Sequence, residues 1–512
     1  MCCRLLACAW LVFIIAGNCA EADETPSRTE AAAAVAKATA FFHNHVASHG
    51  GYLYAYSGDL KLREGEGVAS AETIWVQPPG TPAVGEAFLD AFEATGDKTH
   101  LKAARSAARA LVQGQLHSGG WYYSIEFDPA KRKKTAYRYT MEWQKTPDPV
   151  QPADRAAANG WEAWKRRKYE GNQTILDDDV TQAAMRFLIR LDRVLKFDDE
   201  TVHEATLFGL KSLLQMQYPN GAWSASYDRF QNQSPSEQAY PVIRASYPES
   251  WPRTWPKDFT GCYVTNDDLM EKMIRTMLLA WRVYGDERYR QSAERAGRFL
   301  LLAQMPEPQP AWAQQYDSQM HPVWSRAFEP SAISGRESQF IMDALLLLCR
   351  ETGDKKYLEP IPRAIAYFRR SLLPDGKLSR FYELRTNRPL YFTRGQGGGH
   401  VMTYENDRLA SNYGFIIDSR LDAIAAEHQR LTTGDAAALN GRGSNLLSSA
   451  MEPNALSVRQ VIDSLDARGA WVEKTRMRHN KVEPASGVIS SETFANNVRA
   501  LSRFVADSPQ AR

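Results

Sequence analysis

The stretch Ala94-Thr95-Gly96-Asp97, together with the helical run from Leu101 to Leu116 that follows it, decides the fold of this chain. A glycine adopts the left-handed conformation that ends a helix at little cost, and an aspartate directly after it can cap the next helix. The same pattern recurs at Tyr284-Gly285-Asp286 and at Thr352-Gly353-Asp354, and a related turn runs from Leu195 through Asp199. The chain therefore predicts a series of helical hairpins.

Each predicted hairpin carries an apolar stripe along one face. Examples from two helices are Leu207, Leu210 and Leu214, and Ala293, Phe299 and Leu300. A single hairpin cannot bury such a stripe, so the hairpins have to stack into a solenoid or a ring. We therefore predict a mainly α fold, an α/α barrel or partial toroid built from repeated helical hairpins. The widest loop, residues 224–259, is expected to help form the binding face.

The first 20 residues are typical of a secretory signal peptide. Arg4 precedes an apolar run from Leu5 to Ile15, and Ala20 stands at a suitable cleavage point. The apolar run is too short to span a bilayer. We therefore expect residues 1–20 to be a signal peptide, and the protein to be exported to the periplasm or the extracellular space without a membrane span.

The repeat pattern fades beyond Tyr404. We expect residues 21–404 to form the toroid and residues 405–512 to form a C-terminal extension of weak helical character. Within that extension, helical patterns run from Val458 to Leu465 and from Thr493 to Val505. Neither of them carries a chemically distinctive motif.

The composition narrows the range of functions. The chain has 512 residues and a formal net charge of +2, and no block of Lys or Arg stands out, which argues against a nucleic-acid binder. It contains no GxSxG, P-loop or HExxH motif. Beyond the signal segment only Cys262 and Cys349 remain, so neither a disulfide framework nor a zinc site is expected, and their pairing is left open. We expect a monomer.

Two acid-rich segments stand at predicted helix starts. The first is Asp177-Asp178-Asp179, where one acid could cap the helix, but three exceed what capping needs. The second is Thr265-Asn266-Asp267-Asp268, in which Thr265 or Asn266 is suited to be the cap. The remaining carboxylates would suit a divalent cation such as Ca²⁺, which prefers oxygen ligands. Because both segments start helices of one toroid, they could converge at the same end.

Two arginine-bearing segments, Trp324–Pro330 and Arg380–Pro389, complete the candidate site. The forked guanidinium group matches carboxylates, and arginine beside proline in extended chain is held rigidly. An isolated arginine–glutamate neighbourhood more often forms a structural ion pair. Acids and arginines gathered on one face would instead suit a metal ion that bridges to an anionic substrate, whose other carboxylates contact arginine.

These segments resemble motifs of the family 10 polysaccharide lyases, the pectate lyases, and they occur in the same order. The resemblance covers roughly residues 175–392. It rests on five motifs: Asp177-Asp178-Asp179 with Arg186-Phe187-Leu188; Gln217-Tyr218-Pro219-Asn220-Gly221-Ala222-Trp223; Thr265-Asn266-Asp267; Trp324-Ser325-Arg326-Ala327-Phe328-Glu329-Pro330; and Arg380-Phe381-Tyr382-Glu383 with Thr386-Asn387-Arg388-Pro389.

The resemblance implies a partial toroid with a calcium-dependent groove that cleaves polygalacturonate, an acidic polysaccharide, by β-elimination. By the matching motifs, Asp267 binds the calcium ion and Asp177 is a second essential aspartate at the metal. Arg326 falls at the position of the Brønsted base, and Arg388 at that of a clamp on a substrate carboxylate. Further substrate-binding candidates from the last motif are Asn387 and Arg380. Removing the C5 proton of a galacturonate places negative charge on its C6 carboxylate, so a cation there would stabilise the transition state.

Two other functions are left open by the residues themselves. A glycoside hydrolase on an α/α toroid needs two carboxylates about 5–10 Å apart, and Asp177 and Asp267 could fill those roles. A non-catalytic protein that binds acidic glycans could use the same scaffold. A terpene-cyclase-like toroid also has Asp-rich helix starts, but export argues against it because isoprenoid substrates are made inside cells.

Overall fold

The computed structural model describes residues 26–139, 171–228, 234–257, 261–411, 413–434 and 457–507. The predicted signal peptide, residues 1–20, lies outside the described residues. Within the described part, no helix is both long enough and apolar enough to cross a membrane.

Helices dominate the chain and strands are short. The α-helices are α1 (Arg28–Phe41), α2 (Thr81–Thr95), α3 (Lys98–Gln113), α4 (Pro129–Arg132), α6 (Val180–Val194), α7 (Glu200–Met216), α8 (Leu269–Tyr284), α9 (Glu287–Ala303), α10 (Gly335–Thr352), α11 (Ile361–Arg370), α12 (Leu421–Thr433), α15 (Val458–Asp463) and α16 (Ser491–Asp507). A π-helical turn, η1 (Phe42–Val46), continues α1, and single 3₁₀ turns are η3 (Asp177–Asp179), η4 (Asn266–Asp268) and η5 (Lys355–Leu358).

The strands are β1 (Ala55–Ser57), β2 (Arg63–Glu64), β3 (Thr73–Trp75), β4 (Ser124–Glu126), β5 (Thr174–Ile175), β6 (Ser226–Tyr227), β7 (Tyr263–Val264), β8 (Gln315–Tyr316), β9 (Ala332–Ser334), β10 (Leu378–Ser379), β11 (Phe381–Glu383), β12 (Pro389–Arg394), β13 (His400–Thr403), β14 (Ile416–Ile417), β15 (Val472–Glu473) and β16 (Val488–Ser490). They pair antiparallel in small sheets. The largest have the strand orders β13-β12-β11-β9 and β15-β16-β1-β2.

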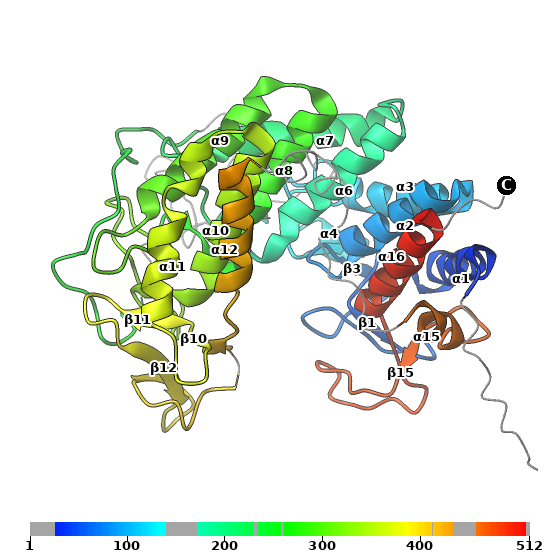
Figure 1. Cartoon of the computed structure of the whole chain (residues 1–512). Helices are drawn as coiled ribbons and strands as arrows, with labels where there is room; N and C mark the ends of the chain where they lie inside the picture. Colours follow the sequence, from blue (N-terminus) through cyan, green and yellow to red (C-terminus); the bar gives the residue numbers. More distant parts are fainter. Residues whose placement is uncertain are drawn as a thin grey trace, which may run out of the picture.

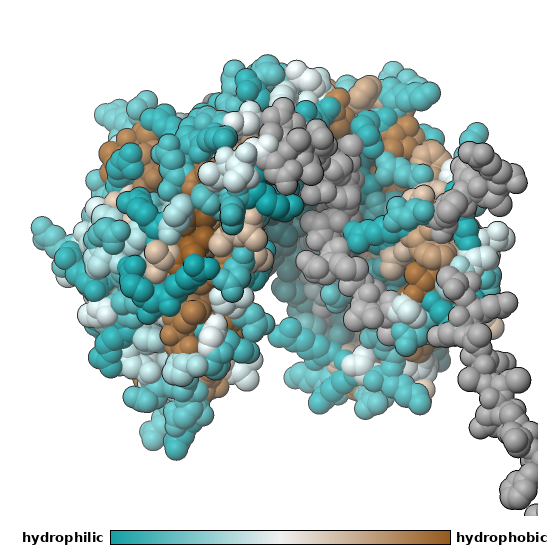
Figure 2. All heavy atoms as spheres, in the orientation of Figure 1, coloured by the Kyte–Doolittle hydropathy of each residue, from teal (hydrophilic) through white to brown (hydrophobic). Residues whose placement is uncertain are grey.

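The helices form two layers of an open ring. The inner layer runs in the order α16, α2, α6, α8, α10, and each helix contacts the next (Figure 1). The helices α3, α7, α9 and α11 pack outside α2, α6, α8 and α10. Inner helices such as α6 and α10 are buried on most sides, as expected for helices without a broad polar face. Among the described residues the ring stays open between α12 and α16, and the space-filling view in the same orientation shows the gap between the two sides (Figure 2). This confirms the predicted mainly α, partial toroid of helical hairpins.

The predicted turns join inner and outer helices. Gly96, Gly285 and Gly353 end α2, α8 and α10 in the left-handed conformation, with φ of 73°, 70° and 78°. The aspartate after each glycine accepts a hydrogen bond from a backbone N–H of the next helix, so these turns are confirmed. The apolar stripe predicted for α7 is partly wrong. Leu210 is buried, but Leu207 is 36% exposed and Leu213 takes the inward position.

After three of the outer helices, a glutamine bonds to the next repeat and a tryptophan bonds back to the helix that it follows. Gln217 Nε2 donates to the carbonyls of Gly221 and Ser292, and the Trp223 indole donates to the carbonyl of Leu213. The same pattern recurs after α3 and α9, with Gln115 and Trp121, and with Gln304 and Trp312. Because each glutamine bonds to the following repeat, it fixes the stacking between hairpins.

The C-terminal elements pack at both ends of the ring. The helix α12 contacts α10 and α11, whereas α16 contacts α1 and α2, and β16 pairs with β1. The helical patterns predicted at the C-terminus correspond to α15 and α16. The division of the chain at residue 404 stays a prediction. Cys262 and Cys349 do not form a disulfide.

Candidate functional site

Two acidic turns at the same end of the ring are built alike. In both, a two-residue strand leads into a 3₁₀ turn and then an inner helix: β5, η3 and α6, and β7, η4 and α8. Each turn contains two successive residues in the left-handed region, Asp178 and Asp179 with φ of 53° and 60°, and Asp267 and Asp268 with φ of 48° and 64°. Aspartate tolerates this conformation better than most residues, but it is still strained. Asp178 and Asp267 therefore occupy equivalent positions.

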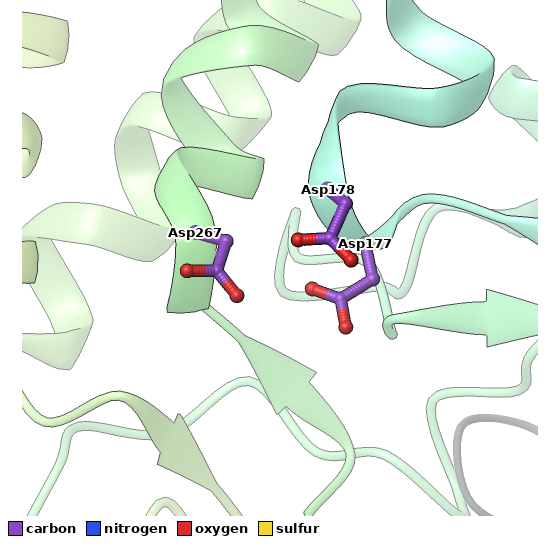
Figure 3. A group of neighbouring side chains, drawn as sticks. All are labelled: Asp177, Asp178 and Asp267. Carbon is purple, nitrogen blue, oxygen red and sulfur yellow. The ribbon is translucent and has the colours of Figure 1, made fainter. Parts of the chain in front are cut away.

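The two turns bring three carboxylates together. Oxygens of Asp177, Asp178 and Asp267 all lie within 4.8 Å of one another. Figure 3 shows the three side chains pointing toward a shared space from the starts of α6 and α8. We call these three residues the acid trio. The convergence expected from the sequence is thus observed, and Asp178 joins the two aspartates that the motifs singled out.

The remaining acid of each turn is held by cations. Asp179 accepts from Arg186 at 2.6 Å and faces Lys272 at 3.5 Å, while both oxygens of Asp268 are bonded by Arg336 at 2.9 and 3.1 Å. Burial would raise the pKa of Asp179, but Arg186 and Lys272 outweigh it and hold that pKa below its usual value. These ion pairs anchor the two strained turns to α6, α8 and α10.

The prediction that Thr265 or Asn266 caps the helix after the second turn is wrong. The Thr265 hydroxyl donates instead to the carbonyls of Ala313 and Gln314, and Asn266 donates its amide to Asp267 Oδ2. No side chain caps α6 or α8 at its first turn. Thr265 lies beside the segment that leads into β8, so its hydroxyl group connects the acidic turn to that segment.

Two arginines border the acid trio, one from each predicted segment. Arg326 lies 2.7 Å from Glu329 and 3.4 Å from Asp267, and its side chain is 46% exposed. Arg380 is buried, 2.9 Å from Glu337 and 3.9 Å from Asp267. The carboxylate of Asp267 therefore has two guanidinium groups and two aspartates as neighbours.

The three carboxylates of the acid trio repel one another when they are ionised. Burial, and then the charges of Asp178 and Asp267, raise the pKa of Asp177 well above its usual value. Burial also raises the pKa of Asp178, and it raises that of Asp267 to about 6 with the charge of Asp178 adding to it. Within the described residues, Asp177 Oδ1 is buried without a hydrogen-bond partner. Three clustered carboxylate oxygens with an unsatisfied acceptor fit a hard divalent cation such as Ca²⁺.

Arg326 is firmly protonated in this setting. Burial alone would lower the pKa of its guanidinium, but nearby carboxylates, Glu329 first, raise it. Burial would in turn raise the pKa of Glu329, but Arg326, Ser325 and Tyr413 hold it below its usual value. Tyr413 donates to Glu329 at 2.9 Å and lies under the Arg380 guanidinium at 4.0 Å. Glu329 thus orients Arg326, and Tyr413 contacts both Glu329 and Arg380; the part of Tyr413 was not predicted from the sequence.

Asn387 and Arg388 lie elsewhere, at the far end of β11. Asn387 is bonded by Tyr367 and Gln309 and donates to Ser371, so it supports the turn before β12. The Arg388 guanidinium lies 3.4 Å from the centre of the Tyr404 ring. No described contact joins Asn387 or Arg388 to the acid trio. Their substrate-binding roles stay predictions, whereas Arg380, the weaker candidate, lies beside Asp267.

The widest loop reaches the arginine segment. Of residues 224–259, the structure describes 224–228 and 234–257. The Trp255 indole donates to the carbonyl of Ser325 at 2.9 Å, next to Arg326, and Trp255 is 40% exposed. Arg253 pairs with the buried carboxylate of Glu383. The loop therefore borders the candidate site at Arg326, as expected from the sequence.

No model of a known protein family and no curated protein matches this chain. Similar solved structures include a family 10 polysaccharide lyase from Cellvibrio cellulosa, with 15% identity over 68% of this chain and 97% of that chain and a TM-score of 0.41. Others are a sugar epimerase from a ruminal bacterium (10% identity, 94% and 99% covered, TM-score 0.46) and an unsaturated glucuronyl hydrolase from a Bacillus species (12%, 93% and 97%, 0.38). These neighbours differ in reaction, so they do not select one for this chain.

In the metal-free protein, replacing Asp177 or Asp179 by asparagine should change the stability in opposite directions. We expect Asp177→Asn to raise the unfolding free energy by about 1–2 kcal/mol at about pH 8, because it removes one of three clustered charges. We expect Asp179→Asn to lower it by about 1–3 kcal/mol, because Arg186 and Lys272 lose their partner. Urea denaturation in a chelator measures both.

The increase in unfolding free energy caused by Asp177→Asn should become smaller as the pH falls toward about 5. A raised pKa means that the folded state binds the proton more tightly than the unfolded chain, so the wild-type protein gains stability as its trio takes up protons. Asp267, with a pKa of about 6, titrates in this range. A loss of stability in both variants would contradict the described charge balance.

Proposed function

We propose that the protein is an exported, monomeric pectate lyase that cleaves α-1,4-polygalacturonate by calcium-assisted β-elimination, and that residues 1–20 are its signal peptide. The observation that carries the proposal is the acid trio bordered by Arg326 and Arg380 at one end of the ring. An anionic sugar could face positive charge on both sides there. The motifs that resemble family 10 polysaccharide lyases supply these same residues.

The acid trio would hold the calcium ion, with Asp177, Asp178 and Asp267 each giving an oxygen ligand. When bound, the ion supplies positive charge beside the C6 carboxylate of a galacturonate, where negative charge grows as the C5 proton leaves. Asp179 and Asp268 are already neutralised by ion pairs, so they would keep the turns in place rather than bind metal.

Arg326 would act at the C5 carbon as the proton acceptor. Its exposed guanidinium is directed by Glu329, which is itself fixed by Ser325 and Tyr413. Because nearby carboxylates stabilise the protonated form of Arg326, it has to lose a proton before it can act as a base. Arg380, buried under Asp267, would keep that carboxylate oriented. Elimination would therefore favour alkaline conditions.

A glycoside hydrolase is the second candidate function. The raised pKa of Asp177 would suit a general acid, and its carboxylate lies within 4.8 Å of that of Asp267, near the shorter separation of retaining enzymes. The two functions differ in product, because only elimination creates a carbon–carbon double bond at the new non-reducing end. They also differ in metal dependence.

The lyase proposal is tested by incubating the purified full chain with polygalacturonate and Ca²⁺ while following ultraviolet absorbance. We expect absorbance from unsaturated ends to rise, and a chelator to abolish the rise until excess Ca²⁺ is restored. New reducing ends without absorbance, unaffected by the chelator, would favour the hydrolase. Binding of polygalacturonate without any cleavage would favour a non-catalytic protein.

Arg326→Ala should separate turnover from binding. We expect the turnover number to fall by about 10²–10⁴-fold, because the base is lost, while the affinity for polygalacturonate changes little. In the wild type, kcat/KM should rise with pH because the base must be deprotonated. Arg298→Ala, an exposed arginine on α9, is the matched control and should retain full turnover. If Arg326→Ala keeps the wild-type turnover number, Arg326 is not the base.

A further inference from the structure

The outer helix α3 carries positive charge only. Lys98, Lys102, Arg105 and Arg109 follow one another at intervals of four, three and four residues, so they share one face of the helix over about 16 Å. The helix has no Asp or Glu. Like charges three or four residues apart each disfavour a helix by about 0.2–0.5 kcal/mol.

Another outer helix, α9, has mixed charges. There Arg290 pairs with Glu287 at 2.6 Å and with Glu294 at 3.1 Å, which is the usual arrangement of a solvated helix face. The outer layer is therefore not uniformly positive; α11 also lacks Asp and Glu, but its Arg369 pairs with Asp422 at 2.8 Å.

A hollow of about 370 Å³ lies along this face, between η1 and α3. It is lined by the four cationic residues together with His43, Leu101 and Ser106. Arg105 pairs with Asp199 at 2.8 Å, but no carboxylate of the described residues pairs with Lys98, Lys102 or Arg109. Arg105 Nε and His43 Nδ1 are buried without a hydrogen-bond partner in the described part of the chain. The hollow thus offers several donors and an excess of positive charge.

We propose that this hollow is a second binding site that holds a carboxylate-bearing polysaccharide on the outside of the ring. A row of cations along about 16 Å of helix suits an extended polymer with regularly spaced carboxylates better than a single small anion. The apolar side chain of Leu101 can contact the apolar face of a sugar ring. That the polymer is the enzyme's own substrate rests on the proposed function.

A single-stranded nucleic acid fits the hollow less well. Such ligands bind through aromatic side chains on which bases stack, as well as through cations. Among the described residues that line the hollow, none is Phe, Tyr or Trp. The lining therefore favours a polymer whose charges, rather than whose rings, provide most of the contact.

The test compares two double variants of the full chain that each remove one lysine and one arginine. Lys102→Ala with Arg109→Ala alters the hollow, and Lys211→Ala with Arg298→Ala removes two exposed charges from α7 and α9. Alanine favours helix, so both should fold. Binding to polygalacturonate is measured by affinity electrophoresis in a chelator, with a neutral galactan as the reference polymer.

We expect at least a five-fold loss of affinity for polygalacturonate in the hollow variant, no loss in the control variant, and no binding of the galactan. Equal affinity in both variants would overturn the proposal, as would equally tight binding of single-stranded DNA through the same two residues. Because the assay needs no cleavage, affinity lost in the hollow variant supports the second site even if no lyase activity is found.

Discussion

Repulsion among three carboxylates is the constraint on which the rest of this structure depends. Asp177, Asp178 and Asp267 face one another at the starts of two inner helices, where burial raises the pKa of each. An arrangement of this kind lowers the stability of the folded protein when no cation is bound, so neighbouring interactions have to hold the three carboxylates in place. The ion pairs of Asp179 and Asp268 do this, because they fasten the left-handed turns to α6, α8 and α10.

The ring supplies the rigidity that those turns require. Each of the glutamines joins one hairpin to the next, so the hairpins that begin with α6 and α8 cannot separate without breaking a buried hydrogen bond. The two arginines beside the acid trio, Arg326 and Arg380, are also fixed by buried contacts. Glu329 and Glu337 are buried and hold Arg326 and Arg380 beside Asp267. A strained acidic centre on a stiff scaffold is the arrangement expected of a preorganised charge-stabilising site.

Much of the fold could be predicted from local sequence, because its signals are local. A glycine that must be left-handed and an aspartate that caps the next helix mark each turn, as at Gly96 and Asp97. It was harder to predict which side chains of a helix point toward the core. Leu207 was expected inside but lies exposed, and Leu213 is buried in its place.

The candidate site was predictable in outline but not in detail. Two acid-rich helix starts in successive repeats could meet at one end of the ring, and they do. Which carboxylates turn inward depends on left-handed backbone at Asp178 and Asp267, which no residue pattern specifies. Likewise, Arg380 and Arg388 belong to one motif, but the hairpin of β11 and β12 sends them to opposite ends of the strand. Tyr413 acts through contacts with distant segments and left no local signal.

Calorimetric titration of the metal-free protein with Ca²⁺ tests the acid trio most directly. The account predicts one ion per chain at about pH 8, an affinity that weakens below about pH 6 as Asp267 takes up a proton, and loss of binding in Asp267→Asn. Asp268→Asn, which breaks only the ion pair with Arg336, should weaken binding far less. If the wild type binds no Ca²⁺, or if Asp267→Asn binds it as tightly as the wild type, the three carboxylates do not form the metal centre and the account fails.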